Sequence, residues 1–128
     1  MAHHILADKN MKYSTIINKE YYTTEGCHII EVMNTAEQEN VSIARARVEP
    51  GVRTRVHYLI DTSEHYCVQQ GRGLVFLDEQ AGFEVIPGDI VAIEPGQHQS
   101  IENIGNEDLI FLCVCTPRFK QENYVEVG

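Results

Sequence analysis

The chain has 128 residues, 43% of them apolar and 23% charged, which suits one folded domain and not a chain that is disordered as a whole. Its 19 Asp and Glu residues outnumber 10 Lys and Arg residues, and the resulting net charge of −9 disfavours nucleic acids and anionic membranes as partners. No apolar run approaches the roughly 18–20 residues of a membrane-spanning helix, and the first ten residues lack a signal-peptide pattern. We therefore expect a cytoplasmic protein with no membrane contact.

The first forty residues have the least regular pattern of the chain. We expect short strands over 15–17 and 27–32, a polar turn over 34–40, and a poorly ordered extension over the first ten residues.

From Val41 onward, short apolar segments recur about every ten residues and end at Gly or Pro. This spacing, without any long helical period, predicts an all-β antiparallel sandwich or barrel. The expected strands cover residues 43–48, 56–60, 65–69, 74–77, 90–93 and 110–114.

Two spaced motifs lie in order in this region. The first reads Gly51-x5-His57-x-Leu59-x4-Glu64-x6-Gly71, and the second reads Gly88-x5-Glu94-x-Gly96-x2-Gln99-x3-Asn103. They resemble the two motifs of the cupin family, G-x5-H-x-H-x4-E-x6-G and G-x5-P-x-G-x2-H-x3-N. The resemblance implies a double-stranded β-helix, or jelly-roll barrel, formed by residues 41–128. Residues 1–40 would then pack on the barrel or on the partner in a homodimer.

The resemblance also implies a divalent metal, since the family uses these positions for a cage of three His and one Glu. Only His57 and Glu64 are kept here, while Leu59 and Gln99 replace two histidines. Leucine cannot bind a metal, and a glutamine oxygen binds borderline metals more weakly than imidazole does. Iron, zinc, nickel or manganese would bind His57 and Glu64, with Gln99 completing the set. A one-residue shift of the turn before Gln99 would turn His98 inward instead, and both alternatives remain open.

Alternation along strands predicts which other side chains share this interior. Arg55 and His57 would share one face, and Glu64 and Tyr66 the face of the next strand. Tyr66 is therefore a candidate acid or hydrogen-bond donor, and Arg55 a candidate anchor for an anionic group. The simpler interpretations are packing for Tyr66, a salt bridge to one of the acidic residues for Arg55 and a hydrogen-bonded core residue for His57. Asn103 and the motif glycines are expected to shape turns.

The four cysteines form no CxxC pair. Cys113 and Cys115 are expected to lie on one face of a strand as reduced thiols. Cys67 should point outward, which argues against a Cys-His nucleophile.

These features lead to two functional hypotheses. The first is a metal-dependent enzyme, isomerase-like or oxygenase-like, acting on a polar or anionic small molecule. The second is a metal-free cupin that binds a small molecule without catalysis. A homodimer is expected in both cases.

Overall fold

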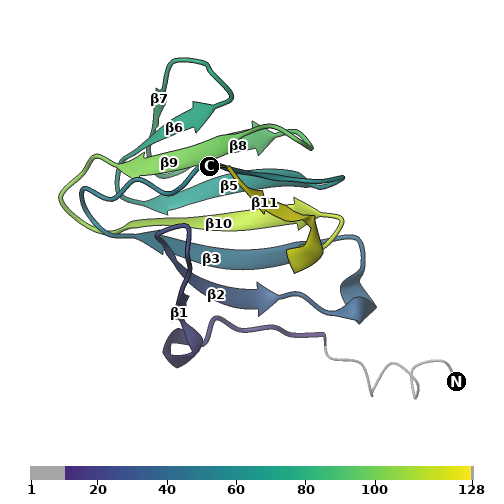
Figure 1. Ribbon diagram of the computed structural model, residues 1–128. Coiled ribbons are helices and arrows are strands. Elements are labelled where there is room, and N and C mark those ends of the chain that lie inside the picture. Colours follow the sequence, from purple (N-terminus) through teal and green to yellow (C-terminus); the bar gives the residue numbers. More distant parts are fainter. Residues whose placement is uncertain (1–10, 128) are drawn as a thin grey trace, which may run out of the picture.

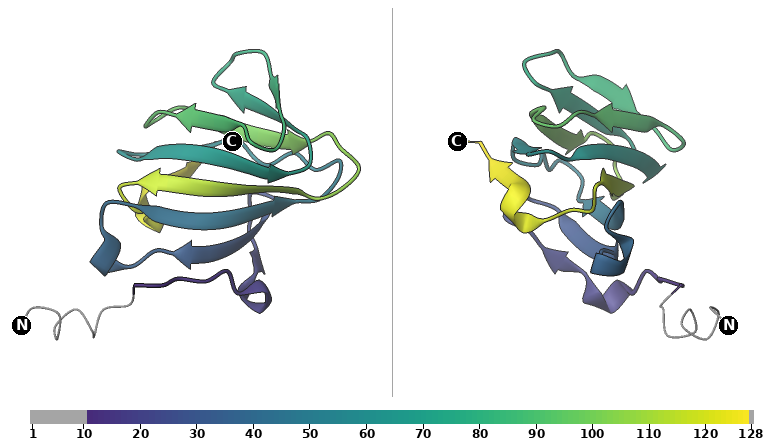
Figure 2. Two further views of the ribbon diagram at one scale, coloured as in Figure 1. Left: turned by 180° about the vertical axis from the view of Figure 1, so that it is seen from behind. Right: turned by 90° about the vertical axis from the view of Figure 1, so that its right-hand side faces the viewer.

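Residues 11–127 are described by a computed structural model, in which two antiparallel sheets face each other (Figures 1 and 2). The first sheet has the order β1-β2-β3-β10-β5-β8, with bounds Tyr21–Tyr22, His28–Met33, Ser42–Val48, Leu109–Thr116, Ser63–Gln70 and Ile90–Ile93. The second has the order β11-β4-β9-β6-β7, with bounds Tyr124–Glu126, His57–Leu59, Gln99–Asn103, Gly73–Leu77 and Phe83–Val85. The all-β jelly-roll prediction is confirmed, and five of the six strands expected from residue 43 onward are present over their full predicted ranges. The strand expected over 56–60 is too long, since β4 covers only His57–Leu59.

Strand β10 lies in the interior of the six-stranded sheet, between β3 and β5. It pairs along its length with β3 on one side and β5 on the other. A strand covered on both edges must satisfy its backbone within the sheet, and its almost wholly apolar sequence suits that central position. Leu109 and Phe111 place their side chains in the core between the sheets.

The early part of the chain extends this sheet. β2 pairs with β3 and buries Ile30, and Glu20 binds the Arg47 guanidinium through both carboxylate oxygens at 2.6 and 3.1 Å. The strand expected over 15–17 is wrong: Ile17–Lys19 forms a 3₁₀ turn, in which the Lys19 amide donates to the Ile16 carbonyl. The expected extension over residues 1–10 lies outside the described residues, and the domain boundary at residue 40 stays a prediction.

Asn103 has the structural role expected of it. It is almost fully buried, its Nδ2 donates to the carbonyls of Val48 and Glu107 at 2.8 Å each, and its Oδ1 accepts from the Gly105 amide at 2.9 Å. This single side chain ties β9 to the end of β3 and to the turn before β10.

The remaining short elements are two further 3₁₀ turns, Ala36–Gln38 and Gln121–Asn123. Within residues 11–127, no helix is long and apolar enough to cross a membrane.

Candidate active site

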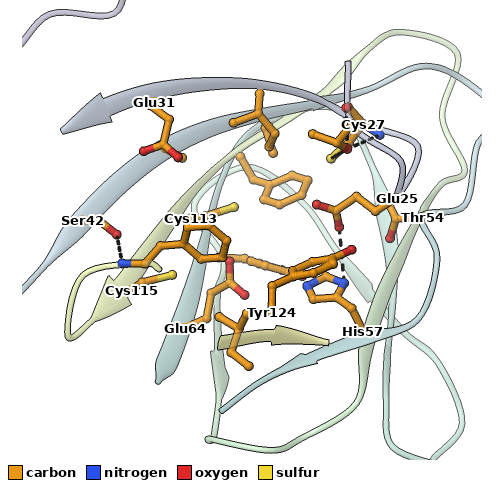
Figure 3. Close-up of a pocket in the computed structure, with 18 of the residues that line it drawn as sticks. Glu25, Cys27, Glu31, Ser42, Thr54, His57, Glu64, Cys113, Cys115 and Tyr124 are labelled. Atoms are coloured by element: carbon orange, nitrogen blue, oxygen red, sulfur yellow. Dashed lines mark hydrogen bonds and ion pairs between the residues drawn. The ribbon is translucent and has the colours of Figure 1, made fainter. Parts of the chain in front are cut away.

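A cavity lies between the two sheets, with about 100 Å³ free for water-sized groups (Figure 3). β2, β3, β5 and β10 contribute one wall, and β4 and β11 contribute the other. A loop before β2 brings residues 23–27 to the same space. A concave site with apolar walls and a few convergent polar groups is the usual form of a small-molecule site.

His57 begins β4 and is 5% exposed. Its Nδ1 lies 3.3 Å from Oε2 of Glu25 and 3.4 Å from the carbonyl oxygen of Arg55 (Figure 3). Its ring stacks on Tyr124 of β11 at 4.9 Å between centroids. Two oxygens beside Nδ1 favour the proton on that nitrogen, so Nε2 keeps the lone pair that can take a proton.

Glu25 is held by a tight loop between β1 and β2. Its carbonyl accepts from the Arg55 amide at 2.8 Å, and the next residue, Gly26, has φ of 100°, a conformation that side chains other than glycine rarely adopt. Burial raises the pKa of the Glu25 carboxyl, and the nearby His57 opposes that shift. Glu25 was missed by the sequence analysis, because its only signal was an acidic residue before a glycine outside the recognised motifs.

Glu64 lies on β5 across the cavity and is 7% exposed. Its Oε1 has no hydrogen-bond partner among the described residues. Burial raises the pKa of Glu64 to about 7, while the nearby His57 lowers it and Glu25 raises it further. A carboxyl with this pKa exchanges protons near neutral pH.

Tyr66 and Gln99 form a polar pair behind this carboxyl. The Tyr66 hydroxyl donates to Oε1 of Gln99, and Gln99 pairs with His57 across β9 and β4 and is 1% exposed. His98 faces outward, where its ring stacks on Tyr58 at 5.0 Å and its amide donates to Asp78. Of the two alternatives left open by the sequence, Gln99 is therefore the residue that points inward.

Arg55 does not face the cavity, so the predicted inward position is wrong. Its side chain is 66% exposed and lies 3.6 Å from Glu126 on the surface. β4 begins only at His57, and the preceding segment does not alternate like a strand. There, Thr54 is buried instead and exchanges hydrogen bonds with the backbone of Ile101.

The residues present do not fit the family's metal cage. Leu59 lines the cavity with no donor atom, and the Gln99 oxygen already accepts from Tyr66. His57 has its Nδ1 directed at Glu25. Among residues 11–127, no group of three or more His, Cys, Asp and Glu side chains is placed to hold a metal ion.

Three cysteines, Cys27, Cys113 and Cys115, also line the cavity. Cys113 and Cys115 share a face of β10, as expected, and all four cysteines are free thiols. Burial raises the pKa of each of the three thiols, so they stay protonated and act as apolar wall. Cys67 does not line the cavity.

Comparison with known proteins finds relatives in sequence, one of which matches most of its own length to this chain. A protein of Methanocaldococcus jannaschii whose function is not characterised is 37% identical over 107 residues, covering 82% of this chain and 85% of that protein. Oxalate decarboxylase of Bacillus subtilis is 27% identical over 119 residues, which span 88% of this chain but only 30% of that protein. The oxalate-binding protein of Thermotoga maritima is 37% identical over 71 residues, 56% of this chain and 58% of that protein.

Solved structures share the fold at low sequence identity. A Streptomyces Pac13 structure with uridine superposes with a TM-score of 0.75 at 15% identity, covering 92% of each chain, and Pac13 is described as a nucleoside dehydratase. A double-stranded β-helix protein of Klebsiella pneumoniae has a TM-score of 0.75 at 18% identity, covering 94% of this chain and 99% of that one. The model of the family described as Cupin matches residues 16–127, so the chain belongs to the cupin family.

Proposed function

We propose that this cupin binds a small polar molecule between its sheets and catalyses a proton transfer on it, as in an isomerisation or a dehydration. The observation that carries the proposal is the Glu25–His57 pair inside the cavity, with Nδ1 at 3.3 Å from the carboxylate and Nε2 without a hydrogen bond in the described part of the chain. A carboxylate in this position orients the imidazole and stabilises the imidazolium that forms when Nε2 takes a proton.

The proposed step uses His57 twice. Nε2 removes a proton from a carbon next to an electron-withdrawing group, and the imidazolium then returns it. If the proton goes to a neighbouring carbon, the product is an isomer; if it goes to a leaving hydroxyl, water and an alkene are formed. No electrons are gained or lost overall. Glu25 positions His57, and Glu64 accepts a hydrogen bond from a donor on the substrate through its unpartnered oxygen.

The comparisons agree with this class of reaction without defining it. Pac13, which shares the fold, is named as a dehydratase and has been crystallised with uridine, a neutral polar molecule. The oxalate decarboxylase and the oxalate-binding protein are named for a dianion. In this chain Glu25, Glu31 and Glu64 line the cavity, and none of the described lining residues is Lys or Arg. This lining favours a neutral or cationic ligand over the anionic one that the exposed Arg55 had suggested.

A metal-dependent reaction is the second candidate, and the unpartnered oxygen of Glu64 favours it. We place it second because a metal ion bound by His57 and Glu64 would find no further ligand at the other two family positions. Leu59 has no donor atom, and the Gln99 oxygen already accepts a hydrogen bond from Tyr66. Elemental analysis of protein purified without chelator tests it. Near-stoichiometric iron, zinc, nickel or manganese that is lost in His57→Ala would support the metal-dependent candidate.

Exchange in D₂O tests the proton transfer. A panel of small neutral and cationic carbonyl and hydroxy compounds is incubated with chelator-treated protein, and loss of C–H signals is followed by proton NMR. We expect exchange or turnover of at least one compound, none with His57→Gln, and at least about tenfold slower exchange with Glu25→Gln. Exchange that appears only after a divalent metal is restored, or that persists in His57→Gln, would contradict the proposal.

The homodimer and the cytoplasmic location stay predictions. The homodimer is supported by exposed apolar side chains near β1, which lies at one edge of the six-stranded sheet.

A further inference from the structure

Glu64 and its neighbours give the cavity an excess of negative charge. Glu25 faces His57, Oε1 of Glu64 has no hydrogen-bond partner among the described residues, and Glu31 adds a third carboxyl group to the lining (Figure 3). A buried carboxylate without a partner is costly, and a cation placed beside it offsets that cost.

The basic side chains nearest to the cavity are paired elsewhere. Arg55 lies 3.6 Å from Glu126 on the surface. Arg118 and Lys120, which follow β10, both bind Glu39 at 2.8 and 3.0 Å. The described cavity lining therefore has no permanent positive charge of its own, and His57 is its one group that can become positive.

Aromatic rings form much of the remaining wall. Tyr66 packs on Phe111 at 4.6 Å, and Phe119 meets the edge of Tyr124 at 6.5 Å, so rings from β5, β10 and the C-terminal segment line the cavity together with the glutamates. Ring faces attract ammonium groups within about 6 Å, and they do so most strongly where water is excluded. Bare inorganic cations prefer several oxygen or nitrogen ligands at once, and among residues 11–127 no three His, Cys, Asp or Glu side chains are grouped to hold such an ion.

We propose that the ligand of this cavity is a small organic cation, an alkylammonium ion held by Glu64 and by the aromatic rings that line the same cavity. This inference rests on the proposed function for the choice of cavity, and it names the class of substrate. The free space of about 100 Å³ limits the ligand to a small molecule. A dianion such as oxalate would meet three carboxylates and no fixed cation.

The test compares choline with 3,3-dimethyl-1-butanol, a neutral molecule of nearly the same shape, by calorimetry at constant ionic strength. We expect choline to bind at least about tenfold more tightly than its neutral counterpart, and oxalate not to bind. Glu64→Gln should remove most of this preference. The matched control Glu79→Gln, which deletes the same charge in the exposed β6–β7 turn at the far end of the molecule from β1 and β2, should keep it (Figure 1).

The outcomes separate this inference from the proposed function. Equal affinity for choline and its neutral counterpart, or a preference unchanged in Glu64→Gln, would overturn the cation inference, even if His57-dependent exchange is found with neutral compounds. If calorimetry shows that the protein binds zinc or nickel but not choline, the cation inference would be overturned as well. A preference for choline that survives in His57→Gln, together with no exchange by the wild-type protein on any compound, would support the inference while removing the proposed catalysis. Thermal unfolding of Glu64→Gln confirms that the variant is folded.

Discussion

At the scale of single residues, the Glu64 carboxyl links stability to pH. Its pKa rises from 4.5 to about 7 because of burial, so the folded state binds its proton more tightly than the unfolded state does. The contribution of Glu64 to the free energy of unfolding is therefore largest below pH 4.5. It falls by about 3 kcal/mol as the pH rises from 4.5 to about 7, and it does not return at higher pH.

Glu64→Gln should remove this penalty, since the neutral amide resembles the protonated acid. Urea unfolding is expected to show the variant more stable than the wild type by about 2–3 kcal/mol at pH 8, with the difference vanishing below pH 4.5. A variant that is less stable at pH 8 would mean that the groups favouring the ionised carboxylate, His57 among them, outweigh the cost of its burial.

Arg55→Ala should have little effect, because its ion pair with Glu126 is largely exposed to water. We expect a loss of stability below about 1 kcal/mol and unchanged exchange in D₂O. A loss of ligand binding in this variant, measured by calorimetry, would show that Arg55 contacts the ligand, contrary to its exposed position in the structure.

At the scale of elements, the Asn103 side chain joins β9 to the end of β3 and to the turn before β10 through three hydrogen bonds. Asn103→Ala leaves two carbonyls and one amide at the β9 turn without their partner, and we expect a loss of about 2–3 kcal/mol in urea unfolding. Asn106→Ala, in the exposed part of the same turn, is the control and should change stability by less than about 0.5 kcal/mol. Equal effects of the two substitutions would contradict the structural role of Asn103.

Alternation explains how much of the site could be predicted from the sequence. Within β5 the period of two correctly placed Glu64 inward, because strand geometry holds there. For β9 the sequence left Gln99 and His98 as alternatives, and the structure places Gln99 inward. The period of two failed for Arg55, which lies before β4 begins and outside any ladder. Glu25 could not be found in this way, since its position depends on a loop that only the pairing of β2 with β3 brings to the cavity.

At the scale of the whole molecule, the N-terminal segment leaves apolar side chains uncovered. Ile17 and Tyr22 are well exposed near β1, and a strand at a sheet edge can pair with another copy. We expect sedimentation to show a dimer and Ile17→Lys combined with Tyr22→Lys to give a folded monomer. A dimer unchanged by both substitutions would show that a different surface makes the contact.

The central claim is that the side chains of this cavity themselves exchange protons and hold the ligand. Carbon-13 NMR titration of the Glu64 carboxyl in chelator-treated protein tests it most directly. The account predicts a midpoint near pH 7 in the free protein, which falls when choline is added because a nearby cation favours the ionised form. A midpoint near 4.5, or one that choline does not move, would contradict it.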